Sequence, residues 1–253
     1  MRYSDLLQNT FLFLCIFGPI LFILSFITQI SLLGIAGLLV FAIGVSSLLI
    51  KPQHQIVGES ILNSFLPISV NLNNILNSLN VKGKGIYLPP KVNESNAYVF
   101  VPYNEFDLLS KLSAIEGIRG RKVAVKEGVI LQSNGASIVD SFERNIGLNF
   151  SELGLTLLRD TLYRVIVDEM GILSNIFMEI LENSVYFIFY GSIFWTLCEK
   201  IQRDIPGFCT KLGCPLCSAI GSILSKITSR YVLIDECVII SRERKIETIY
   251  RLI

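Results

Sequence analysis

Residues 7–50 read LQNTFLFLCIFGPILFILSFITQISLLGIAGLLVFAIGVSSLLI and contain one ionisable side chain, the thiol of Cys15. Two apolar runs, at about residues 7–27 and 32–50, fill this stretch. At about 1.5 Å per residue, each run is roughly 30 Å long, which is the thickness of the hydrocarbon core of a bilayer. The sequence therefore predicts a transmembrane helical hairpin over residues 1–51.

The hairpin is predicted to be tight. Its linker, residues 28–31 (TQIS), is short and uncharged. Gly34, Gly37 and Gly44 lie near one face of the second helix, and small residues on such a face let two membrane helices approach closely.

Positive charge near the two runs predicts the orientation of the hairpin. Arg2 precedes the first run, whereas the linker carries no Lys or Arg. The second run is followed by Lys51, Lys82, Lys84 and Lys91. Cytoplasmic loops are enriched in Lys and Arg. We therefore expect a multi-pass protein of the cell membrane, anchored in the lipid bilayer by two helices, with both termini in the cytoplasm.

A third apolar stretch, residues 185–198 (VYFIFYGSIFWTLC), lies between Glu182 and Glu199. Its 14 residues are short for a membrane span and favour a core strand followed by a core helix. A third span is the alternative.

Composition excludes several classes of protein. The chain has 253 residues, 51% of them hydrophobic and 17% charged, and its mean hydropathy is +0.57. Such a chain is too apolar to be disordered, and its net charge of +1 provides no basic field for nucleic acid. His54 is the only histidine. A zinc site with several histidines is therefore excluded, and a Ser-His-Asp triad would have to be built around His54.

Residues 52–80 are predicted to form an amphipathic juxtamembrane segment, broken at Pro67. Glu59 is the only carboxylate from residue 53 to residue 80, and no Lys or Arg occurs there. Apolar residues at positions 72, 75, 76 and 79 follow the helical period. Because surface-lying helices usually carry Lys or Arg, packing against the body or a second copy is favoured over packing on the bilayer.

Residues 81–253 are predicted to form a cytosolic α+β domain that ends in a β-hairpin, with two lobes meeting near Gly147 as a possible subdivision. Strand-like runs occur at residues 86–88, 97–101, 121–125, 129–132, 175–181 and 185–190, and helical patterns at 105–115, 151–166 (with a Ser151 cap), 193–201 and 218–228. A helix over 172–181 fits almost as well as a strand. The closing runs, 231–240 and 245–253, are rich in β-branched residues, and this arrangement favours hairpins over βαβ crossovers.

Cys209, Cys214, Cys217 and Cys237 are the one group of residues with evident chemical potential. Their C-x4-C-x2-C spacing with a distant fourth Cys matches the ligand pattern of plant-type [2Fe–2S] proteins. Four thiolates also make a closed tetrahedral zinc site. One hypothesis is therefore a membrane-tethered metal module that uses Zn or Fe–S through these four residues.

Two other interpretations of the cysteines remain open. Cys214-Pro215-Leu216-Cys217 is similar to the CPxC motif of glutaredoxin-like proteins, and a helix N-terminus lowers the pKa of a thiol such as Cys214. This predicts a thiol–disulfide oxidoreductase. The other interpretation is that these thiols pack in the core, because free cysteines are among the most buried residues.

The layout resembles a family of uncharacterised archaeal membrane proteins that have a two-helix anchor and a cytosolic domain with a CPxCS segment. The matching residues are 7–50, Tyr87-Leu88-Pro89-Pro90, Cys214-Pro215-Leu216-Cys217-Ser218 and the closing strand pair. The last third is also similar to small-molecule-binding domains that end in helix, strand and strand. The resemblance to the archaeal membrane protein family implies no activity and no catalytic residue.

Neither GxxxxGK[ST] nor GxGxxG occurs in the chain, so neither phosphate-loop motif applies. The sequence favours a membrane-anchored domain that binds a ligand, a protein partner or a second copy of itself over an enzyme.

Overall fold

The computed structural model describes residues 3–49, 53–90, 97–104, 124–125, 127–147 and 149–253. The helix predicted at 105–115 lies outside these residues. Contacts within the chain divide it into two compact units, Met1–Ile56 and Val57–Ile253.

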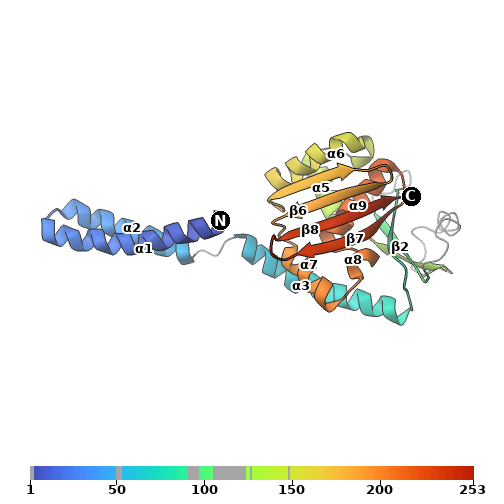
Figure 1. Cartoon of the computed structure of the whole chain (residues 1–253), viewed down its shortest axis with the longest axis horizontal. Helices are drawn as coiled ribbons and strands as arrows, with labels where there is room; N and C mark the ends of the chain where they lie inside the picture. Colours follow the sequence, from blue (N-terminus) through green and yellow to red (C-terminus); the bar gives the residue numbers. More distant parts are fainter. Residues whose placement is uncertain (1–2, 50–52, 91–96, 105–123, 126, 148) are drawn as a thin grey trace. The chain divides into compact units, whose positions relative to one another are not determined.

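The first unit contains a pair of helices that lie side by side, α1 (Tyr3–Thr28) and α2 (Ser31–Leu49) (Figure 1). Their backbones approach closely at glycines. A Cβ atom added to Gly18 would lie 2.7 Å from the Phe41 backbone nitrogen, and one added to Gly37 would lie 2.7 Å from the Gly18 carbonyl oxygen. No side chain fits at these points, so the predicted close approach of the two helices is confirmed.

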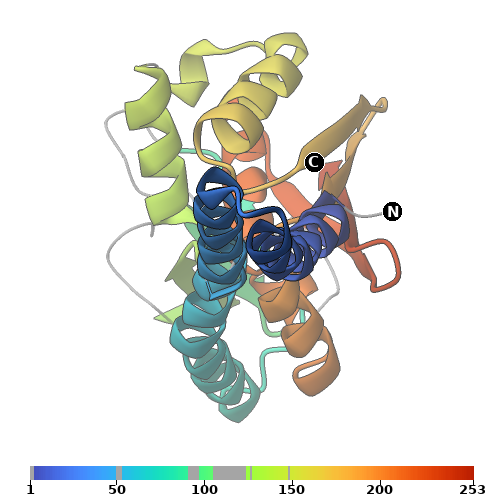
Figure 2. The same cartoon turned by 90° about the vertical axis from the view of Figure 1, so that its left-hand side faces the viewer.

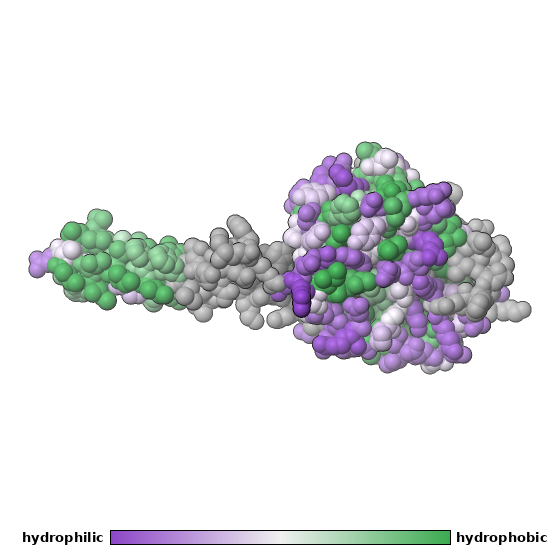
Figure 3. Space-filling view, in the orientation of Figure 1, coloured by the Kyte–Doolittle hydropathy of each residue, from purple (hydrophilic) through white to green (hydrophobic). Residues whose placement is uncertain are grey.

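The described side chains on the outward surface of this helix pair are mostly apolar, with a hydrophilic tip at the turn between the helices (Figure 3). Phe26, Ile27 and Leu32 are 72%, 74% and 77% exposed, and apolar side chains are exposed along both helices. A soluble helix usually shows an apolar stripe and a polar opposite face, whereas this pair shows apolar side chains on its outside.

By length and composition, one stretch of the described residues, Phe208–Thr228, is sufficient to cross a membrane, and 89% of it is buried within the protein. It comprises two helices with a break between them and belongs to the core. Shorter apolar stretches lie in the helix pair, at Phe13–Thr28 and Leu32–Val45. The helices of the predicted hairpin are therefore present, and their insertion into a membrane stays a prediction.

The second unit is an α+β body around an antiparallel sheet of eight strands, in the order β3-β4-β2-β1-β7-β8-β6-β5 (Figure 1). The strands are β1 (Ile86–Leu88), β2 (Tyr98–Pro102), β3 (Ala124–Val125), β4 (Gly128–Gln132), β5 (Asn175–Ile180), β6 (Ser184–Tyr190), β7 (Val232–Ile240) and β8 (Lys245–Leu252). This confirms the predicted α+β class and the closing hairpin.

Helices cover one face of the sheet, and the opposite face of β5, β6, β8 and β7 is turned toward the viewer in Figure 1 (Figures 1 and 2). The helices are α3 (Gln53–Ser78), α5 (Ala136–Ile146), α6 (Leu155–Leu162), α7 (Trp195–Asp204), α8 (Phe208–Lys211) and α9 (Pro215–Thr228), with a 3-10 turn at Phe150–Glu152 and a π-helix at Tyr163–Glu169. Helix α9 lies in the middle of the core, where it contacts β1, β7, β8 and α5.

Helix α3 is continuous through Pro67, so the predicted break at that residue is wrong. The missing N–H of Pro67 removes one helical hydrogen bond, but packing on the body holds the helix on both sides of it. Leu76 is 1% exposed, and Phe65 and Val70 pack against the same core. The prediction that this segment packs against the body is confirmed.

The region before β5 differs most from the prediction. Helix α5 was not expected, and the expected long helix is divided into the 3-10 turn, α6 and the π-helix. Its predicted cap, Ser151, lies inside the 3-10 turn, which Asn149 caps by accepting a hydrogen bond from the Ser151 backbone N–H. The helix alternative for residues 172–181 is also wrong, because β5 pairs with β6.

Two further predictions concern how the body is organised. Strand β6 pairs with β5 on one side and β8 on the other, so residues 185–198 form the expected core strand followed by α7. The second prediction was a possible subdivision of the body into two lobes near Gly147. Strands that precede Gly147 and strands that follow it belong to one sheet, and the border between the two compact units lies at Ile56 and Val57, inside α3.

Candidate functional site

The fold brings the four predicted cysteines together beneath the sheet. Cys214 is the N-cap of α9, and its sulfur accepts a 3.5 Å hydrogen bond from the Cys217 backbone N–H. Pro215 follows at the first helical position, where a proline costs no helical hydrogen bond. Cys209 comes from the short helix α8, and Cys237 from β7.

Thr248 links two of these thiols. It faces Cys237 across the β7–β8 ladder, and its hydroxyl donates to the Cys237 sulfur at 3.8 Å and lies 3.8 Å from the Cys217 sulfur. The Tyr250 hydroxyl donates to the Cys217 carbonyl oxygen at 2.9 Å. The Tyr87 hydroxyl donates to the Leu212 carbonyl oxygen at 3.0 Å.

A fifth thiol, Cys198 of α7, belongs to the same cluster and was missed by sequence reasoning. Its interaction with Cys214 lowers its pKa, but complete burial and the neighbouring thiols outweigh this and raise the pKa of Cys198 to about 12. No spacing pattern connects Cys198 to the other four, because only the packing of α7 against α8 and β7 brings it there.

The thiols differ in the direction of their pKa shifts. The pKa of Cys214 is raised well above its usual value by its hydrogen bond to Cys198 and by burial. The pKa values of Cys209 and Cys217 are raised likewise, by hydrogen bonds to neighbouring cysteines and by burial. The pKa of Cys237 is lowered, because Cys209, Cys217 and Thr248 all donate hydrogen bonds to its sulfur.

These geometries do not support the oxidoreductase hypothesis for Cys214. A nucleophilic thiol needs a lowered pKa and access to its substrate. Cys214 is completely buried and its pKa is raised. The half-buried Cys237 is the thiol whose pKa is lowered, and it lies on a strand outside the CPxC segment.

The metal hypothesis stays a prediction. The four predicted ligands gather from three elements, but among the described residues no three His, Cys, Asp or Glu side chains are arranged to hold a metal ion. Metal binding would require the sulfurs to draw closer around a common centre, since Zn–S bonds are about 2.3 Å long.

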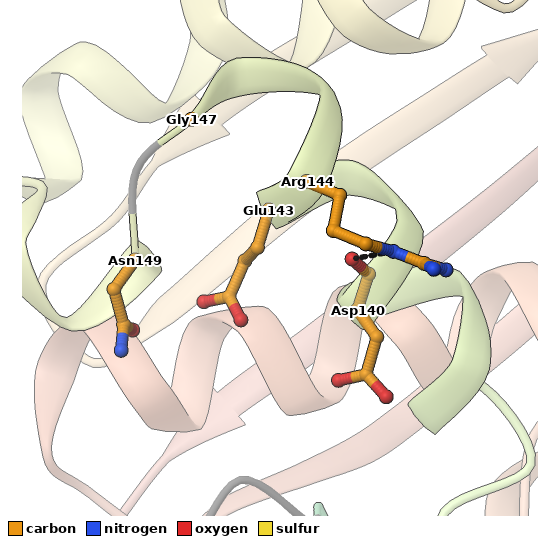
Figure 4. Close-up of a pocket in the computed structure, with 5 residues that line it drawn as sticks. All are labelled: Asp140, Glu143, Arg144, Gly147 and Asn149. Atoms are coloured by element: carbon orange, nitrogen blue, oxygen red, sulfur yellow. Dashed lines mark hydrogen bonds between the residues drawn. The ribbon is translucent and has the colours of Figure 1, made fainter.

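An open depression of about 530 Å³ lies at the C-terminal end of α5, lined by Asp140, Glu143, Arg144, Gly147 and Asn149 (Figure 4). Glu143 accepts hydrogen bonds from the Lys226 ammonium at 2.7 Å and from the Phe150 backbone N–H at 2.8 Å. Arg144 donates to the Asp140 backbone carbonyl oxygen at 3.2 Å. The two Glu143 bonds fasten α5 to α9 and to the following turn, and the Arg144 bond lies within α5, so all three have a structural role.

The outer face of the sheet, the one without helices, is unusually apolar. Three rows of four residues cross β5, β6, β8 and β7 in register. The rows are Phe177, Ile188, Glu247 and Val238; Glu179, Tyr186, Ile249 and Glu236; and Asn175, Tyr190, Lys245 and Ile240. Seven of these twelve positions are apolar or aromatic, and none of the twelve is fully buried. We call these twelve residues the outer sheet face.

A solvated sheet face normally carries polar side chains. Here Phe177 is 46% exposed and its ring meets Tyr186 edge-on at 6.4 Å between centroids. Lys245 bonds Glu243 at 2.8 Å and Glu247 at 3.1 Å, so the charges at this end of the face are paired within the molecule. Sequence reasoning missed this face, although the outward residues of β6, Tyr186, Ile188 and Tyr190, gave a signal.

Comparison with known proteins gives one family. Residues 10–194 match the family described as "Domain of unknown function (DUF7982)". No curated protein and no solved structure matches the chain. The match begins inside α1, includes α2 and most of the body, and ends before α9 and before β7 and β8, two strands in the middle of the sheet. Because the match covers well over half of its residues, the chain belongs to the DUF7982 family of domains of unknown function.

Proposed function

We propose that this protein is a membrane-anchored binding module, in which α1 and α2 cross the bilayer and the α+β body binds a protein partner in the cytoplasm. The observation that carries the anchor is the exposed apolar surface of the helix pair, where Leu32 is 77% exposed. Removing such a surface from water is favourable by about 25 cal/mol per Å². Both termini are assigned to the cytoplasm because Lys and Arg flank the pair and are absent from its turn.

Two measurements test the anchor. The full chain, expressed in cells, is expected to stay with the membrane fraction after alkaline carbonate extraction, which removes peripheral proteins. Protease added to the outside of intact cells is expected to leave tags at both termini uncut. Release by carbonate contradicts the anchor, and cleavage of either tag contradicts the orientation.

The outer sheet face supports partner binding by the body. Monomeric proteins rarely expose large apolar patches without a function, and interface cores are enriched in Tyr and Phe. On this face Tyr186, Tyr190 and Phe177 lie on neighbouring strands with Ile188 between them. Glu247 lies in the middle row of this face and is paired with Lys245 at 3.1 Å, so burial of the face by a partner leaves no unpaired charge at Glu247.

A photo-crosslinking amino acid at Ile188 tests this surface in the full membrane-bound chain. We expect a crosslink at Ile188 to a defined protein, lost when Tyr186→Asp is added. A crosslinker at Asn145, which is exposed on α5, is the matched control and should give no such product. Equal crosslinking at both positions contradicts a specific interface on the outer sheet face.

The gathering of Cys209, Cys214, Cys217 and Cys237 supports an alternative proposal, a membrane-tethered Zn or Fe–S module. Metal analysis and the visible absorption spectrum of chain purified without oxygen or a metal-binding tag distinguish the two proposals. Stoichiometric zinc or iron that disappears in Cys217→Ser would support the metal module. Free thiols without metal would contradict it.

A further inference from the structure

The outward side of α3 is uncharged from Ser60 to the end of the helix. From Ser60 to Asn80 the sequence has no Asp, Glu, Lys, Arg or His. Exposed helices elsewhere in the body are charged, as α7 shows with Lys200, Arg203 and Asp204. The solvent-facing side of a helix usually carries charged side chains, so the uncharged outward side of α3 differs from the other exposed helices of the body.

Three large apolar side chains are exposed on this uncharged side. Ile68, Ile75 and Leu79 are 53%, 54% and 42% exposed. Their spacings of seven and four residues place them on one line along a helix of 3.6 residues per turn. We call them the α3 stripe. It is separate from the buried side of α3, where Leu76 and Ser69 are 1% and 5% exposed.

The connection between α2 and α3 limits where α3 can be. Helix α2 ends at Leu49 and α3 begins at Gln53. These residues are four peptide steps apart, and four extended residues span at most about 14 Å. In any orientation of the two units, α3 therefore begins close to the point where α2 would leave the membrane.

We infer that the α3 stripe lies on the headgroup region of the membrane in which α1 and α2 are anchored, so that α3 is a second, peripheral membrane contact. This inference rests on the proposed anchor. An uncharged face can leave bulk water without desolvating an ion, which would be costly. The Asn and Ser side chains around the stripe, among them Asn71 and Ser64, can exchange hydrogen bonds with lipid headgroups.

The lack of charge also specifies the kind of lipid surface. Basic amphipathic helices bind anionic lipids through Lys and Arg, and salt weakens that binding. From Ser60 to its end, α3 carries no basic residue, and the nearest lysines, Lys82 and Lys211, lie beyond the helix, at and beside Val81. Its membrane contact is therefore independent of anionic lipid and of salt, and a zwitterionic phosphatidylcholine surface is sufficient.

Tryptophan quenching by lipid tests this inference in the full chain. The variants Ile68→Trp and Ile75→Trp place an indole on the α3 stripe, and Asn77→Trp places one on a different exposed side as the matched control. The only natural tryptophan, Trp195, gives a constant background. Each variant is reconstituted into phosphatidylcholine vesicles with brominated acyl chains near the headgroups, and vesicle flotation confirms that the chain is in the membrane.

We expect loss of most of the emission added by Ile68→Trp and Ile75→Trp, with little loss for Asn77→Trp, at both low and high salt. Floating protein with equal, weak quenching at all three positions overturns the inference and leaves the anchor intact. Blue-shifted, unquenched emission that falls away as the protein is diluted in lipid would instead assign the stripe to a second copy, which also overturns it. Failure to float contradicts the anchor itself.

Discussion

Thr248 and Cys237 face each other across the last two strands, and the threonine hydroxyl donates a 3.8 Å hydrogen bond to the cysteine sulfur. The interaction joins the sheet to the buried thiol cluster, because the same hydroxyl lies 3.8 Å from the sulfur of Cys217. It gives Cys237 a donor other than a thiol and makes this cysteine chemically different from the four around it.

Among the five clustered thiols, Cys237 is therefore expected to react first with a small alkylating reagent. Hydrogen bonds from Cys209, Cys217 and Thr248 lower its pKa, and it is half-buried whereas Cys214 and Cys217 are completely buried. Mass spectrometry after brief alkylation at neutral pH should find the label on Cys237 before Cys214. Thr248→Val should raise the pKa of Cys237 and slow its alkylation, because the variant removes the hydroxyl that donates to its sulfur. Preferential labelling of Cys214 would contradict this assignment.

The other thiols predict loss of stability in alkali. A buried thiol with a raised pKa stays protonated in the folded state while the unfolded chain ionises above about pH 8.5. The unfolded state then binds fewer protons, so stability falls as the pH rises. For Cys198 this window extends from about pH 8.5 to its folded pKa of about 12.

Denaturant unfolding of the reduced chain from pH 8.5 upward measures this effect. Each protonated thiol contributes a slope of at most about 1.4 kcal/mol per pH unit, and Cys198→Ala should remove one such contribution. Cys15→Ala, in the helix pair, is the matched control. An unchanged slope in Cys198→Ala would show that this thiol ionises alike in both states.

The ion pair between Lys226 and Glu143 fastens α9 to α5. Its atoms are 2.7 Å apart, and the side chains are only 10% and 18% exposed. Lys226→Met should cost about 3 kcal/mol of unfolding free energy, because it leaves a carboxylate buried without its cation. The double variant with Glu143→Gln should recover most of this loss, since glutamine can still accept from the Phe150 N–H. A double variant less stable than Lys226→Met would contradict this account.

Local patterns predicted much of this fold. Runs rich in β-branched and aromatic residues predicted β7 and β8. Long stretches without charged residues predicted α1 and α2. Helix α5 was missed although Val139, Phe142 and Ile146 carried a helical period. The predicted helix break at Pro67 was wrong, because packing of α3 on the body outweighs the loss of one helical hydrogen bond at proline.

What could not be predicted depends on strand order and helix packing. The outer sheet face exists because β8 lies between β6 and β7, which joins rows of residues from four strands. Cys198 enters the thiol cluster only through the position of α7. No regular residue spacing in the sequence reveals the strand order or the packing of α7.

The close contact between α5 and α9 predicts a sharp steric effect at Gly135. A Cβ atom there would lie 2.1 Å from the Ala219 backbone nitrogen and 2.4 Å from its Cα, both within α9. Gly135→Ala should destabilise the body by several kcal/mol, because overpacking against rigid backbone forces the helices apart. Gly154→Ala is the matched control, since its Cβ would meet only the Thr156 hydroxyl at 3.7 Å. Equal stability of the two variants, measured by thermal unfolding, would contradict the close contact.

The proposed membrane anchor makes its own prediction at Leu38, which is 54% exposed near the middle of α2. An arginine at the centre of a membrane span costs about 3 kcal/mol relative to leucine. Leu38→Arg should therefore lower the carbonate-resistant fraction of the chain, whereas Leu38→Ala should retain it. If α1 and α2 were instead a pair in water, Leu38→Arg would make an exposed position more soluble and leave membrane recovery no lower than in Leu38→Ala. The two variants thus separate a bilayer anchor from a surface that is merely apolar.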